Sequence, residues 1–260
     1  MKKTWTIFAS LLLFSVPLLT AQKIVGTPEV GVEERLGEDV PGSLQFLDEQ
    51  GNPVRLDTLI TKPTILSLVY YSCPGICTPL LSGIVDVLEK LDMQPGKDYE
   101  VVTISFDERD TPKLSRQKKN NYLKAFRKPF PPDAWHWLTG DSASIRAITQ
   151  AVGFHYKRQG NDFVHPGLII ILSPDRKIVR YLYGITFLPF DVKMALTEAS
   201  EGRVGPTISK VLLYCFSYDP EGKKYAFNFL KVTGTLVILL ALLFAAYLVI
   251  GNRLRSKKAR

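Results

Sequence analysis

The apolar positions of this chain fall into continuous runs and into runs with helical spacing. A continuous apolar stretch at residues 65–71 predicts a strand that is buried on both faces of a sheet, and residues 99–106 (YEVVTISF) predict a second buried strand. Between them, apolar residues recur three and four positions apart over residues 80–91, which predicts a helix with a wide buried face. A strand, a helix and a strand in this order predict a parallel strand pair with a right-handed crossover.

Similar patterns on both sides of this unit predict the remaining elements. A hairpin is expected over residues 43–59, and a polar, basic helix is expected from Thr111-Pro112 to about residue 126. The later patterns predict, in order, a strand at 135–139, a helix at 143–152 capped by Asp141-Ser142, a turn at 160–161 between strands 154–156 and 162–164, a hairpin of strands 168–172 and 177–183, and a helix at 190–201. We therefore expect an α/β domain with a central mixed sheet flanked by helices.

The two ends of the chain carry targeting patterns. Residues 1–21 combine Lys2 and Lys3 with an apolar core, which is typical of a secretory signal peptide. The uncharged segment 232–250 is long enough to span a bilayer, and the basic residues of the tail at 251–260 predict that this tail is cytoplasmic. Residues 22–42 are expected to form an extended leader and residues 43–228 the domain. The sequence thus predicts a single-pass protein of the cell (inner) membrane with its domain on the extracytoplasmic, periplasmic side.

The basic character of the chain comes from its ends. Of the formal net charge of +8, Lys2 and Lys3 contribute two and the C-terminal tail contributes five, which leaves +1 for the rest. A nearly neutral domain offers no electrostatic reason to bind DNA or RNA, so we predict no nucleic-acid partner.

Two of the three cysteines lie where chemistry is expected. Cys73 and Cys77 fall on the loop between the first buried strand and the helix, whose predicted cap is Thr78. A helix N-terminus stabilises a thiolate. Cys215 lies in an apolar run and is predicted to be a buried small side chain. A dithiol after the first central strand, followed later by a hairpin and a terminal helix, is the thioredoxin arrangement.

The spacing of the pair is C-x-x-x-C, whereas redox thioredoxin-like motifs use C-x-x-C. The wider loop can direct both sulfurs at a metal, and two thiolates select Cu(I), or zinc when further ligands join them. Of the three histidines, His136 and His155 lie within short strands and are predicted to be structural. His165 precedes strand 168–172, and in thioredoxin-like folds that loop approaches the dithiol loop. We therefore predict a metal site formed by Cys73, Cys77 and His165.

Longer motifs support a specific resemblance between about residues 43 and 222. They are YYSCPGICTPLL, SFDERDTP, WHWLTGD, AVGFHY, DFVHPGLIIILSPDRKIVRYLYG and YDPEGKKY. With these motifs the chain resembles the Sco/SenC family, copper-binding thioredoxin-like factors for cytochrome c oxidase assembly. The resemblance implies that copper, as Cu(I) or Cu(II), is bound by Cys73, Cys77 and His165, and that Asp107 tunes these ligands. The chain departs from familiar members in its C-terminal span and in Ser217, which stands where many relatives have histidine.

Two functions are compatible with the dithiol. The resemblance implies maturation of the binuclear copper centre of an oxidase subunit, by copper delivery or by reduction of that subunit's cysteine pair. The expected partners are then this subunit, a copper donor protein and the membrane. The alternative is an extracytoplasmic thiol-disulfide oxidoreductase or peroxidase that uses Cys73 and Cys77 as a redox pair without copper. A binuclear-copper electron carrier is excluded, because it needs a histidine four residues after the second cysteine, where this chain has Leu81.

Overall fold

The computed structural model describes residues 29–204 and, beyond them, 216–219, 224–227, 233, 234, 237 and 240. The predicted signal peptide, the basic tail, Cys215 and most of the predicted membrane span lie outside these residues. In the described part of the chain, no helix has both the length and the apolar character needed to cross a bilayer.

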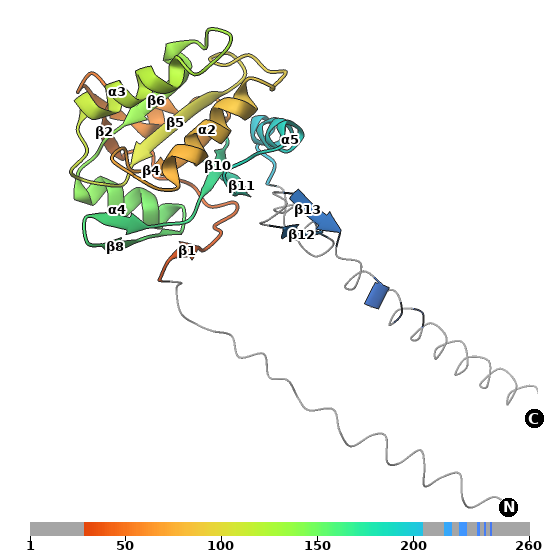
Figure 1. Cartoon of the computed structure of the whole chain (residues 1–260). Helices are drawn as coiled ribbons and strands as arrows, with labels where there is room; N and C mark the ends of the chain where they lie inside the picture. The colour runs from red at the N-terminus through yellow and green to blue at the C-terminus, as the bar shows by residue number, and fades with distance from the viewer. Residues whose placement is uncertain are drawn as a thin grey trace, which may run out of the picture.

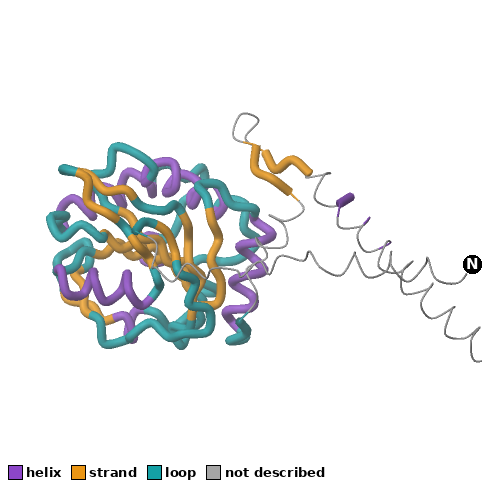
Figure 2. Tube along the Cα trace, turned by 90° about the horizontal axis from the view of Figure 1, so that it is seen from below, coloured by secondary structure: helices purple, strands orange, loops and turns teal. Residues whose placement is uncertain are grey.

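A five-stranded mixed sheet forms the centre of the domain, as predicted, and Figure 2 shows its strands passing between the surrounding helices. Its strands, in spatial order, are β11 (Ile178–Tyr183), β10 (Leu168–Leu172), β4 (Thr64–Val69), β5 (Glu100–Ser105) and β6 (Trp135–Leu138). Strands β4, β5 and β6 are parallel, whereas β10 runs antiparallel to both β4 and β11. Every residue of β4, β5 and β10 is buried, which explains why apolar residues predominate in these strands.

The helices connect and cover these strands (Figure 1). Helix α2 (Cys77–Leu88) joins β4 to β5, and α3 (Pro112–Leu123) joins β5 to β6. Helix α2 contacts both α3 and α5 (Pro189–Ser200), while α4 (Ser142–Ala151) packs against β7. Helix α2, which starts at the second cysteine of the pair, therefore lies between two other helices. These contacts hold it in place.

The predicted helix starts are confirmed at α3 and α4 but not at α2. The side chains of Thr111 and Asp141 each accept a hydrogen bond from the first turn of their helices. Helix α2 begins at Cys77 and not after Thr78, because Ile76 already has helical backbone angles, with φ −69° and ψ −21°. The predicted Thr78 cap is therefore wrong, and Cys77 occupies the first helical position.

Shorter elements surround this core. They are β1 (Gly31–Val32), β2 (Gln45–Leu47), β3 (Pro53–Arg55), α1 (Leu56–Leu59), the 3-10 helix η1 (Pro132–Ala134), β7 (Phe154–His155), β8 (Lys157–Gln159), β9 (Asp162–Val164), β12 (Phe216–Asp219) and β13 (Lys224–Phe227). The β2–β3 and β10–β11 hairpins form as predicted. Strand β9 pairs with β8 and not with residues 154–156, because β7 pairs with β1. Through β1, the segment predicted as a leader is joined to the domain from Gly31 onward.

A buried carboxylate joins the ends of the two central parallel strands. Asp110 accepts hydrogen bonds from the backbone N–H of Tyr71 and from the Ser105 hydroxyl, both at 2.6 Å. Burial raises the pKa of Asp110, and these two donors oppose that effect. Since Tyr71 precedes Cys73 by two residues, Asp110 anchors the beginning of the dithiol loop to the loop that follows β5.

Candidate metal centre

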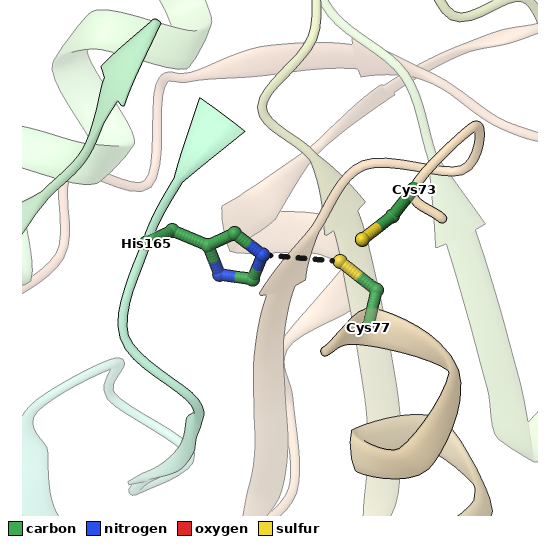
Figure 3. Close-up of side chains that lie close together, drawn as sticks. All are labelled: Cys73, Cys77 and His165. Atoms are coloured by element: carbon green, nitrogen blue, oxygen red, sulfur yellow. Dashed lines mark hydrogen bonds between the residues drawn. The ribbon is translucent and has the colours of Figure 1, made fainter. Parts of the chain in front are cut away.

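Three side chains from two distant segments of the chain meet beside the end of β4. The sulfurs of Cys73 and Cys77 and one ring nitrogen of His165 all lie within 4.8 Å of one another. Figure 3 shows the three side chains pointing toward a common centre. In the described residues this is the one group of three or more histidine, cysteine or acidic side chains with a spacing suited to a metal ion. The structure thus brings together the three residues that the sequence predicted as ligands.

The short loop between β4 and α2 positions both sulfurs. The Cys73 N–H donates to the Tyr70 carbonyl at 3.2 Å, which closes a turn directly after the strand. The Gly75 N–H in turn donates to the Cys73 sulfur at 3.3 Å. Cys77 then begins α2, and both cysteines are free thiols. Backbone hydrogen bonds and the helix therefore hold the two sulfurs on the same side of the loop.

Sheet pairing brings the histidine to this loop. Because β10 is antiparallel to β4, the beginning of β10 lies beside the end of β4, as the Ile169–Ser67 pairing shows. His165 precedes β10 by three residues, and its Nε2 lies 3.2 Å from the Cys77 sulfur. The position of His165 therefore follows from the order and direction of the strands.

The His165 ring is held in one tautomer. Its Nδ1 lies 3.0 Å from the Pro166 carbonyl oxygen, which only accepts hydrogen bonds, so Nδ1 carries the proton. Nε2 then directs its lone pair toward the sulfurs. Burial lowers the pKa of His165, which keeps the ring neutral near pH 7. Metal-binding histidines are usually oriented in this way, by a hydrogen bond from the nitrogen that does not bind the metal.

The site is enclosed. The exposed fractions are 8% for Cys73, 2% for Cys77 and 8% for His165. Burial raises the pKa of the Cys77 thiol, so desolvation outweighs the stabilisation expected from the helix N-terminus. A bound cation would reverse this balance, because metal binding replaces the thiol proton.

Aromatic rings form one wall of the site. The His165 ring contacts Phe106, with ring centroids 5.1 Å apart, and Tyr70, at 5.8 Å. Burial, together with the neighbouring Cys73 thiol, raises the pKa of Tyr70, so its hydroxyl stays protonated. The sequence interpretation did not single out these two residues. The sequence pattern that could have identified them is an aromatic residue directly after a central parallel strand, which is Tyr70 after β4 and Phe106 after β5.

Asp107 is buried near this wall but is bound to an arginine. Its carboxylate accepts hydrogen bonds from the Arg109 backbone N–H and side chain, the shortest from Nε to Oδ1 at 2.8 Å and from Nη2 to Oδ2 at 2.7 Å. Arg109 also donates to the Asn161 carbonyl at 2.8 Å, in the turn between β8 and β9. Asp107 is not one of the three converging residues. The Asp107–Arg109 pair instead connects the loop after β5 to the β8–β9 hairpin, which leads to His165. The sequence did not suggest this role for Arg109.

The other two histidines do not belong to the group of converging residues. His136 Nε2 lies 3.4 Å from a Glu100 carboxylate oxygen, and His155 lies in β7. Of the two positions that lack a histidine, Leu81 is buried on α2 and Ser217 lies in β12.

Comparison with known proteins identifies relatives of this fold. The family model described as SCO1/SenC matches residues 32–198. A SCO1 protein homologue from Bacillus subtilis (strain 168) is 26% identical over 151 residues, which make up 56% of this chain and 75% of that protein. A crystal structure from Aquifex aeolicus VF5 is 31% identical with a TM-score of 0.58, and the match covers 65% of this chain and 95% of that one. Arabidopsis thaliana ScoI, solved with copper bound, shares the fold at 24% identity and a TM-score of 0.51, covering 63% of this chain and 99% of that one.

Replacing Arg109 by alanine should reduce stability more at pH 7 than at pH 4. Burial alone raises the pKa of Asp107, but the hydrogen bonds from Arg109 outweigh burial and lower it. In the parent, the stabilisation from Asp107 is therefore complete above its ordinary pKa of about 3.9 and is lost as the pH falls through the lower folded-state pKa. In the variant, burial raises the pKa, so the ionised carboxylate opposes folding increasingly as the pH rises above about 4.

Urea unfolding of parent and variant at the two pH values measures this difference. Arg127→Ala is the control, because the Arg127 side chain is 92% exposed and should change stability little at either pH. An Arg109→Ala effect of equal size at pH 4 and pH 7 would contradict the assigned ion pair.

Proposed function

Because this chain belongs to the SCO1/SenC family, we propose that Cys73, Cys77 and His165 bind copper and that the protein acts in the maturation of cytochrome c oxidase. The observation that carries the proposal is the convergence of two reduced thiols and one oriented imidazole within 4.8 Å. Two thiolates and an imidazole are ligands that suit copper, and thiolates in particular select Cu(I).

The donor set argues against Ca²⁺, Mg²⁺ and a structural zinc site. Ca²⁺ and Mg²⁺ bind oxygen ligands, and no carboxylate belongs to the converging group in the described residues. A structural zinc site needs four ligands, and the same group offers three. The tautomer of His165, with Nε2 free to bind, fits a metal ligand better than a histidine that only fills space.

For the oxidase, two uses of the site are proposed. In the first, copper is the cargo and passes to the binuclear copper centre of the oxidase subunit, after the protein has received it from a copper donor protein. In the second, Cys73 and Cys77 form a disulfide while a disulfide in that subunit becomes two thiols. The residue-by-residue match to the Sco/SenC motifs supports this choice of client.

The proposed location follows from the sequence patterns. Residues 1–21 act as the signal peptide, 22–42 as the leader, 43–228 as the thioredoxin-like domain and 232–250 as the membrane span. The domain then lies on the extracytoplasmic side of the cell (inner) membrane, and residues 251–260 lie in the cytoplasm.

A pair of reporter fusions tests this topology. Alkaline phosphatase, which is active only outside the cytoplasm, should be active when fused after residue 228 and inactive when fused after residue 260. The reverse pattern, or activity at both positions, would contradict the proposed membrane span.

Removing the imidazole should weaken Cu(I) binding. Loss of even a residue that orients a ligand typically lowers metal affinity by about 10- to 100-fold, so His165→Ala should cost at least about tenfold. Affinity is measured on the full-length chain in detergent by competition with a coloured Cu(I) chelator. The matched controls are His136→Ala and His155→Ala, which remove the other two of the three histidines and should leave the affinity unchanged. Parent-like binding by His165→Ala would refute the ligand assignment and favour thiol exchange.

Thiol exchange, whether in the second proposed use or in a copper-free oxidoreductase, makes a different demand on the same thiols. Exchange requires an exposed thiolate, but Cys73 and Cys77 are 8% and 2% exposed. This burial favours copper delivery over both exchange reactions. We therefore expect iodoacetamide to modify both thiols at least about tenfold more slowly in the reduced, metal-free native protein than in urea, because buried cysteines are inert. Mass spectrometry of the labelled peptides gives the two rates. Modification of the native protein as fast as in urea would favour exchange over copper delivery.

A further inference from the structure

Gly83 is a glycine inside α2, six residues after Cys77. Glycine destabilises the interior of a helix relative to alanine, so its presence needs a reason. A Cβ atom added at Gly83 would lie 1.8 Å from the carbonyl oxygen of Ile185 and 2.9 Å from its carbonyl carbon. The backbone after β11 thus approaches α2 so closely that no side chain fits between them.

The segment that touches Gly83 also holds the loop that carries His165. Gly184 directly follows β11, and its N–H donates to the Gly167 carbonyl at 2.9 Å. Its φ of +106° lies in a region that favours glycine, and this angle turns the chain toward α2. Gly167 follows His165 by two residues. The segment 184–185, which contacts Gly83, is therefore joined to the histidine loop by this hydrogen bond.

A second contact links the same parts. A Cβ added at Gly167 would lie 3.1 Å from the Ile76 side chain and 3.5 Å from the Ile185 side chain. Ile76 directly precedes Cys77. The cysteine loop and helix therefore contact the histidine loop and its support at two places. The contact at Gly83 excludes any side chain, whereas the contact at Gly167 leaves room for one only if neighbouring side chains shift.

We propose that Gly83 is a positioning residue for the metal centre, whose lack of a side chain sets the distance between the Cys77 sulfur and the His165 ring. That distance is 3.2 Å in the present packing. A methyl group at residue 83 must displace either α2 or the backbone of Ile185, and either movement separates His165 from Cys77. The inference rests on the proposed copper site, because it concerns how the third ligand is held.

A double-mutant cycle tests it. In the full-length chain in detergent, Gly83→Ala should lower Cu(I) affinity by about tenfold when His165 is present, the range expected for residues that orient a ligand. In the His165→Ala background, Gly83→Ala should change the affinity by less than about twofold, because the ligand that it displaces is already absent. The control is Gly140→Ala, whose methyl would meet the Phe46 ring at 2.7 Å, away from the histidine loop, and which should leave the affinity unchanged.

The outcomes separate this inference from the proposed function. If the parent and His165→Ala bind Cu(I) equally, the copper site itself is refuted, whatever Gly83→Ala does. If His165→Ala loses affinity but Gly83→Ala does not, or loses it equally in both backgrounds, only the positioning role is overturned. Should Gly83→Ala fail to fold, Gly167→Ala replaces it, because its methyl meets the ends of side chains. A smaller loss that depends on His165 supports the proposal, and no loss overturns it.

Discussion

The pairing of β10 with β4 is the constraint on which the centre of this protein depends. Antiparallel alignment places the beginning of β10 at the end of β4, and the 3.2 Å contact between Cys77 and His165 follows from it. Around this contact, Asp110 anchors the start of the cysteine loop, and Arg109 ties down the hairpin before His165. The close approach at Gly83 acts from the opposite side, through the segment after β11. Three separate restraints thus converge on one ring and two sulfurs.

Enclosure changes what the two thiols are suited for. A thiol with 2% exposure and a raised pKa is a poor nucleophile, although Cys77 begins a helix. The same enclosure favours a soft cation, because it replaces the protons and needs no access for a bulky partner disulfide. The aromatic wall of Tyr70 and Phe106 adds no competing ligands. Desolvation therefore disfavours thiol exchange, in the second proposed use as much as in a copper-free oxidoreductase.

Local signals in the sequence predicted most of the sheet and its helices. Thr111 and Asp141 cap their helices through short-range hydrogen bonds and so mark the helix starts in the sequence, and the apolar runs predict the central strands. The start of α2 was missed by two residues, because the residue before Cys77, Ile76, already has helical backbone angles. Contacts between residues far apart in the sequence could not be predicted from local patterns. Examples are the pairing of β7 with β1 and the hydrogen bond from Arg109 to Asn161, 52 residues later. The three converging residues were predicted because strand order in a thioredoxin-like fold places His165 by the cysteines.

The spacing of the three converging residues also ties the centre to the folding of the chain. Cys73 and Cys77 are four residues apart and stay close in an unfolded polypeptide, whereas His165 is 88 residues from Cys77 and gains its place only by closing a long loop. Before β10 docks, a chain presents two sulfurs without the imidazole. The imidazole joins the two sulfurs only when β10 pairs with β4 in the middle of the sheet. The three converging residues therefore come together in the same step that completes the sheet.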